Sequence, residues 1–113
     1  MKKSYKAYSD GSYLQKADVD PPQTWVIEDV QERAVVVPGG KSKDKLVLFF
    51  KGVSKGLVLN MSNGNTLYEM TGQEDPEEWI GTEVELFVDE TVTYAGKRVG
   101  GIRLRKPSKE QPF

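Results

Sequence analysis

The chain contains neither cysteine nor histidine among its 113 residues. Without cysteine there is no disulfide framework and no thiolate nucleophile, and without histidine there is no imidazole base and no usual zinc site. Hydrophobic runs are short as well: none approaches the ~18 residues of a membrane span, and the lysine-rich start lacks the apolar stretch of a signal peptide. We therefore expect a soluble, cytoplasmic protein of one domain, with no membrane segment, metal, cofactor or hydrolytic activity.

The charged residues are numerous but segregated along the chain. The formal net charge of -1 argues mildly against a nucleic-acid partner. Residues 69–90 carry nine acidic side chains and no basic one, whereas residues 41–55 carry five lysines and one aspartate, and residues 97–109 carry six basic side chains and no acid. Such segregation permits one basic and one acidic face. Chance clustering of ordinary surface charge is the alternative interpretation.

The centre of the chain predicts a strand that leads into a helix. Residues 57–60 form a short apolar run, after which Leu67 and the apolar residues near it follow at helical spacing. Asn60 is a suitable N-cap, because its side-chain oxygen can accept a hydrogen bond from a free amide of the first turn. Gly72 suits the left-handed position after a helix. We expect this helix over residues 61–72.

A single further helical turn is expected between Asp75 and Gly81. Asp75 can cap this turn, and Pro76 suits its first position because proline lacks the N–H that would be unpaired there. We expect Trp79 and Ile80 to point inward and plug one end of the core. The carboxylates around this turn lack the regular spacing and the central glycine of a calcium loop, so we predict no metal site.

Four segments have the alternation or the β-branched content of strands. The longest, residues 24–37, changes hydrophobic phase near Asp29. A bulge or bend there would let the apolar residues on both sides of it face inward, including Ala34 and Val36. The other three strands are expected over residues 45–51, 83–89 and 97–105.

The resulting order of elements is β-β-β-α-β-β, which is the order of the five-stranded oligonucleotide/oligosaccharide-binding (OB) barrel. We therefore predict an all-β, OB-fold-like barrel with one helix over residues 23–106. Residues 107–113 are expected to form a flexible tail. Residues 1–22 are expected to form an arm without regular structure, which packs on the barrel through Tyr13, Leu14 and Val19.

In the OB plan, ligands cross the second and third strands, between the loops that join strands one to two and four to five. This placement brings cationic and aromatic side chains together. Single-stranded DNA needs both kinds, because lysine and arginine release condensed counterions from phosphates and bases stack on aromatic rings. The alternative is that these side chains form an ordinary solvent-exposed surface that binds no ligand. The predicted binding residues are Lys41, Lys43, Lys45, Phe49, Lys51, Tyr94, Lys97 and Arg98, extended by Arg103 and Arg105 if their face is open.

The sequence also resembles a widespread group of small phage and prophage proteins. The resemblance is carried by SYLQKAD from Ser12, LVLFFKG from Leu46, KGLVLN from Lys55, WIG from Trp79 and GKRV from Gly96. Such proteins are encoded among phage replication and recombination functions, so the resemblance implies a role on DNA and assigns no catalytic residue. Where lysine commonly follows WIG, this chain has Thr82, which removes one phosphate contact.

The C-terminal Gln-Pro-Phe is similar to the tip with which bacterial single-stranded-DNA-binding proteins recruit partners, although no acidic run precedes it here. From these observations we predict a non-enzymatic single-stranded-DNA-binding protein that acts in phage DNA replication or recombination. The alternative is a protein-interaction adaptor that uses the same barrel to bind a phage or host replication or recombination enzyme. The sequence leaves open whether the protein forms a homodimer through exposed strand edges.

Overall fold

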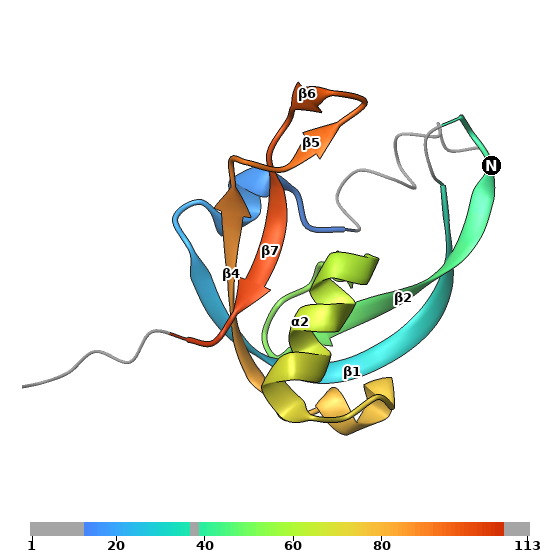
Figure 1. The fold of residues 1–113 in the computed structure, drawn as a ribbon. Coiled ribbons are helices and arrows are strands. Elements are labelled where there is room, and N and C mark those ends of the chain that lie inside the picture. The colour runs from blue at the N-terminus through green and yellow to red at the C-terminus, as the bar shows by residue number, and fades with distance from the viewer. Residues whose placement is uncertain (1–12, 37–38, 108–113) are drawn as a thin grey trace, which may run out of the picture.

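The computed structural model describes residues 13–36 and 39–107, so most of the predicted arm and tail, including the C-terminal Gln-Pro-Phe, lie outside the described residues. The described chain is mostly β, with one α-helix and a sheet of five antiparallel strands in the order β3-β2-β1-β4-β7 (Figure 1). Strands β5 and β6 form a separate hairpin. The elements are η1 (Lys16–Val19), β1 (Gln23–Val36), β2 (Ser42–Phe50), β3 (Leu57–Val58), α2 (Met61–Thr71), η2 (Pro76–Trp79), β4 (Glu83–Asp89), β5 (Thr93–Tyr94), β6 (Lys97–Arg98) and β7 (Gly101–Arg105).

Strand β1 belongs to both halves of the sheet. Its residues up to Val26 pair with β4, and those from Ile27 onward pair with β2. The register shifts between Ile27 and Asp29, which confirms the irregularity predicted near Asp29. The expectation that Ala34 and Val36 face inward is wrong: Ala34 is exposed and Val36 is 54% exposed. The reason is that this end of the β1–β2 pair extends beyond the core as a two-stranded ribbon (Figure 1).

Helix α2 begins and ends where the sequence predicts. The side-chain oxygen of Asn60 accepts a hydrogen bond from the backbone N–H of Asn63 at 2.8 Å, and Gly72 adopts a φ of 73° in the left-handed region. Leu67 is fully buried in the core. The strand before the helix is shorter than expected and ends at Val58, because the chain leaves the sheet to place the cap ahead of the first turn.

The segment before β1 is more regular than expected. It forms the 3-10 helix η1, in which the N–H of Asp18 donates to the carbonyl of Gln15 at 2.9 Å. The contacts predicted for Leu14 and Val19 are confirmed, since Val19 is fully buried and Leu14 packs against the core, whereas Tyr13 forms a backbone bridge with Gly56. The N–H of Leu14 also donates to the carbonyl of Gly56 at 2.8 Å, so this segment lies beside the edge of β3.

The predicted turn after α2 is the 3-10 helix η2. The side chain of Asp75 caps it by accepting a hydrogen bond from the N–H of Glu77 at 3.0 Å. Trp79 is buried, and its indole N–H donates to the carbonyl of Gln73 at 3.0 Å. The inward placement of Ile80 is wrong, because this residue leaves the turn in an extended conformation that turns its side chain outward, where it is 44% exposed.

The core lies between the sheet, α2 and the two 3-10 helices. No backbone pairing joins β3 to β7 in the described part of the chain, so the sheet does not close into a barrel. Helix α2 packs along β7 at this opening, and the side-chain amide of the buried Asn63 donates to the carbonyl of Ile102 at 3.0 Å. The buried apolar residues of the core are Val19, Ile27, Leu48, Phe50, Leu57, Leu67, Trp79, Val84, Leu86 and Leu104.

The segment predicted as one strand over residues 97–105 is divided into two. Strand β6 pairs with β5, whereas β7 pairs with β4 in the main sheet. The division occurs at Val99 and Gly100, whose N–H groups both donate to the carbonyl of Val92, at 2.9 and 3.0 Å. Gly100 has a φ of 75°, a conformation that glycine adopts without strain. The hairpin of β5 and β6 therefore projects from the sheet and does not extend it (Figure 1).

Candidate nucleic-acid interface

One face of the β1–β2 ribbon carries a row of cations that leads to an aromatic side chain. Arg33 on β1 lies directly opposite Lys45 on β2, and residues paired in this way point to the same face. Lys43 and Phe49 are two and four residues away from Lys45 along β2, so they share that face. The structure thus brings together three of the predicted residues, and it adds Arg33, which the sequence analysis missed.

The lysines of this ribbon are not neutralised by neighbouring carboxylates. Lys41 and Lys43 are exposed, and Lys45 is half-buried. None of the three forms an ion pair with a carboxylate among residues 13–36 and 39–107, where the ion pairs present join β7 to β4 and the turn before β3 to η1. Their charges are therefore available to an anion from solution, with little loss of existing interactions.

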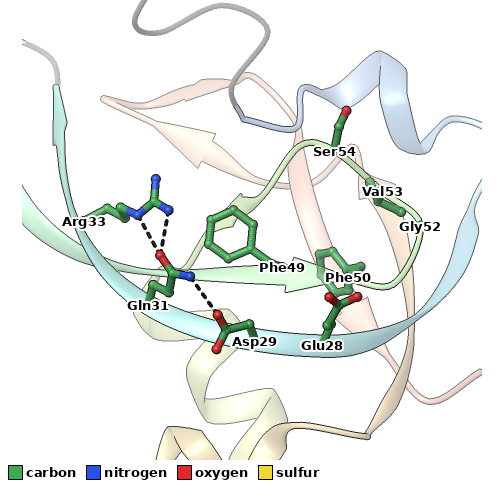
Figure 2. A pocket seen from close by; sticks show the side chains of 9 residues that line it. All are labelled: Glu28, Asp29, Gln31, Arg33, Phe49, Phe50, Gly52, Val53 and Ser54. Carbon is green, nitrogen blue, oxygen red and sulfur yellow. Dashed lines mark hydrogen bonds between the residues drawn. The ribbon is translucent and has the colours of Figure 1, made fainter.

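Phe49 forms part of a surface pocket of about 530 Å³ (Figure 2). The Phe49 ring is half-buried, and the guanidinium carbon of Arg33 lies 5.2 Å from the centre of that ring. This distance is within the range of a cation–π interaction. Ser54 and the neighbouring turn form the opposite wall. The pocket therefore combines an aromatic surface, a cation and polar groups.

Three polar side chains of β1 are held in line along the floor of this pocket. The amide of Gln31 donates to Asp29 at 2.7 Å, and the Nε and Nη2 atoms of Arg33 donate to the carbonyl oxygen of Gln31 at 2.9 and 2.6 Å (Figure 2). Their i, i+2, i+4 spacing is the sequence signal that could have found them, because on a strand it places all three on one face. The sequence analysis used only the apolar residues of this strand.

The hairpin of β5 and β6 presents three more of the predicted residues. Tyr94 is 66% exposed and lies opposite Lys97, and Arg98 lies opposite Thr93. The two residues of the turn have positive φ values, which matches the twist of a tight hairpin. Figure 1 shows this hairpin and the outer end of the β1–β2 ribbon projecting toward the same side of the molecule. The hairpin therefore offers a second surface of cationic and aromatic character.

The remaining predicted residues lie elsewhere. Arg103 and Arg105 are on β7, which β1 and β4 separate from β2 in the sheet. Arg105 donates from Nε to Glu85 at 3.0 Å, and its guanidinium lies 4.0 Å from the centre of the Phe87 ring, so it is already engaged. Lys51 is exposed in the turn after β2, one residue beyond the end of the strand.

Two carboxylates have a lowered pKa for local reasons. The backbone N–H of Gln15, at 2.7 Å, and the ammonium of Lys55 lower the pKa of Asp18. The hydroxyl and the N–H of Thr91, at 2.6 and 2.9 Å, lower the pKa of Asp89. Both carboxylates shape turns of the chain.

The described residues contain no group of three or more histidine, cysteine, aspartate or glutamate side chains that could hold a metal ion. The helices in this part of the chain are too short or too polar to cross a membrane.

The fold and the site define a small, β-rich protein with a cationic and aromatic face. No protein-family model, curated protein or solved structure matches the chain. The geometry of this face and the chemistry of its side chains are therefore the evidence for function.

Proposed function

We propose that this protein binds single-stranded DNA, without catalysing a reaction, in phage DNA replication or recombination. The observation that carries the proposal is the pair Arg33 and Lys45, placed directly opposite each other, with the Arg33 guanidinium over the Phe49 ring. Like charges in this arrangement destabilise a sheet. A phosphate bound between them would reverse the sign of that interaction, because each cation would then lie beside an anion.

The order of the strands supports the same proposal. The order β3-β2-β1-β4-β7, with α2 between β3 and β4, agrees with the OB plan when β7 takes the place of the fifth strand. The β5–β6 hairpin then corresponds to the loop between strands four and five, and the described residues 39–41 to part of the loop between strands one and two. In that plan these two loops flank the nucleic acid.

In the proposed complex the DNA strand follows the face of the β1–β2 ribbon that carries Arg33 and Lys45, and it reaches the pocket beside Phe49. Lys43, Lys45 and Arg33 neutralise phosphates, and Phe49 stacks with a base for about 1–3 kcal/mol. Tyr94 on the β5–β6 hairpin offers a second stacking surface of the same kind. The resemblance to phage proteins encoded with replication and recombination functions gives this binding its biological setting.

The test is fluorescence anisotropy with a labelled single-stranded oligonucleotide of mixed sequence, about 12 nucleotides long, at about 20 to 200 mM salt, a range that spans about a decade of salt concentration. For the double variant Lys43→Gln/Lys45→Gln we expect weaker binding and a salt slope reduced by about 1.4, since each lost phosphate contact lowers the slope by about 0.7. The matched control is Arg103→Gln/Lys106→Gln, which removes the same charge from the other end of the sheet.

Equal losses in the variant and the control would indicate a response to total charge and would contradict this placement of the site. The absence of binding at low salt would overturn the proposal. In that case the adaptor hypothesis would be tested next, by co-purification with replication and recombination enzymes.

A further inference from the structure

The pocket beside Phe49 has opposite charges at its two ends. Glu28 and Asp29 lie at one end, and Arg33 lies at the other, next to Lys45 across the ladder (Figure 2). A phosphate would be repelled from the acidic end and attracted to the basic end. A nucleotide can therefore enter with its phosphate toward Arg33 and its base toward the carboxylates, whereas the opposite orientation places like charges together.

The hydrogen-bonding capacity of the two carboxylates distinguishes among bases. Asp29 is held in place by the N–H of Val30 at 2.9 Å and by Gln31 at 2.7 Å, and each of its oxygens retains capacity to accept a further hydrogen bond. Glu28 is exposed and has no hydrogen-bond or ion-pair partner among the residues that the structure describes. Ionised carboxylates only accept hydrogen bonds, so at position 4 of a pyrimidine they favour an amino group over a carbonyl oxygen.

Arg33 is already oriented for the phosphate. Two of its N–H groups are used by Gln31, which is in turn fixed by Asp29, and a guanidinium has five N–H groups in total. The unused donors remain available beside the Phe49 ring. Because the chain of hydrogen bonds fixes the guanidinium before binding, less side-chain entropy is lost when the phosphate is bound.

We propose that this pocket holds one nucleotide of the bound strand in a defined orientation and selects a base with an exocyclic amino group. In this arrangement the base stacks on Phe49, its amino group donates to Glu28 or Asp29, and its 5′ or 3′ phosphate contacts Arg33. The inference rests on the proposed function, because it assigns base selection to the same DNA-binding face.

The experiment compares labelled (dC)12 and (dU)12, two pyrimidine strands that differ in whether position 4 carries an amino group or a carbonyl oxygen. We expect the native protein to bind (dC)12 at least about five-fold more tightly, since a good contact of this kind discriminates by that much or more. The double variant Glu28→Gln/Asp29→Asn should reduce the ratio of the two affinities to below about two-fold. Arg33→Gln should weaken both strands equally.

Each outcome has a separate meaning. Salt-sensitive binding of both strands with equal affinity would leave the proposed function standing and overturn the base selection. A preference for (dC)12 that survives the carboxylate variant would also overturn it, because the selection would then come from another site. Should that variant fail to fold, as circular dichroism would show, Glu28→Gln and Asp29→Asn are tested separately, and a (dC)12 preference that is unchanged in both would overturn the base selection. No binding of either strand would contradict the proposed function itself.

Discussion

Gly56 packs so closely against β2 that a single added methyl group should destabilise the protein. A Cβ atom at this position would lie 2.6 Å from Cγ1 of Val47, 2.9 Å from Cε1 of Phe49 and 3.1 Å from the carbonyl oxygen of Leu48. Val47 is fully buried and cannot move aside, so the backbone before β3 would have to shift. That shift would also strain the hydrogen bond from Leu14 to Gly56.

The magnitude follows from two opposing effects of Gly56→Ala. Overpacking destabilises by about 1–3 kcal/mol. Replacing glycine also reduces the conformational freedom of the unfolded chain, which stabilises the folded state by about 0.4–1 kcal/mol. We therefore expect a net loss of about 1–2 kcal/mol in the free energy of unfolding, which lowers Tm by about 5–15 °C for a domain of this size.

The assay is thermal unfolding followed by circular dichroism, with Gly64→Ala as the matched control. Gly64 lies in α2, where an added Cβ meets only Leu59 at 3.6 Å, an ordinary contact. Inside a helix alanine is more stable than glycine by about 0.5–1 kcal/mol, so the control substitution should raise Tm. A Gly56→Ala variant that is as stable as the native protein would refute the close packing of Gly56 on Val47 and Phe49.

Two further predictions concern stability. Asn63→Asp removes the donor to Ile102 and introduces a buried carboxylate that faces a carbonyl oxygen. Urea unfolding at pH 7 should therefore show a loss of about 3 kcal/mol in the free energy of unfolding, with partial recovery at pH 4. A loss that is independent of pH would contradict a buried charge as the cause. Asp18 and Asp89 have folded-state pKa values below the ordinary aspartate value of about 3.9. The two carboxylates therefore stabilise the folded protein at pH values above about 3.9, and this contribution is lost as the pH falls through their lower, folded-state pKa values. Urea midpoints should therefore fall in acid, and the fall should be smaller in Asp18→Asn; an identical acid profile in the variant would show that Asp18 makes no such contribution.

The parts of the fold that were predictable depend on neighbours in sequence. Asn60 and Gly72 mark the ends of α2 because capping involves residues within one turn of each other. The irregularity at Asp29 was visible as a change of hydrophobic phase along one strand. By contrast, the division between β6 and β7 depends on the carbonyl of Val92, whose pairing with two later N–H groups has no local signature.

The candidate site was predictable to a similar extent. The OB plan grouped Lys43, Lys45 and Phe49, and the structure places all three on one face of β2, whereas Lys51 lies beyond the end of this strand. The partner of Arg105 could not be predicted, because Glu85 is 20 residues away and becomes its neighbour only through the pairing of β4 with β7. The spacing of Arg33 from Asp29 and Gln31 was visible in the sequence, whereas its position opposite Lys45 depends on the strand register.

The register shift between Ile27 and Asp29 divides β1 into a part that belongs to the core and a part that carries the candidate site. The part before it is bound to β4 and the core, and the part after it runs out into the ribbon that carries Arg33. The outer end of the ribbon buries little apolar surface, so substitutions there have little effect on stability. The charge of this ribbon, and with it any preference for one ligand over another, can therefore diverge between related proteins while the core stays the same.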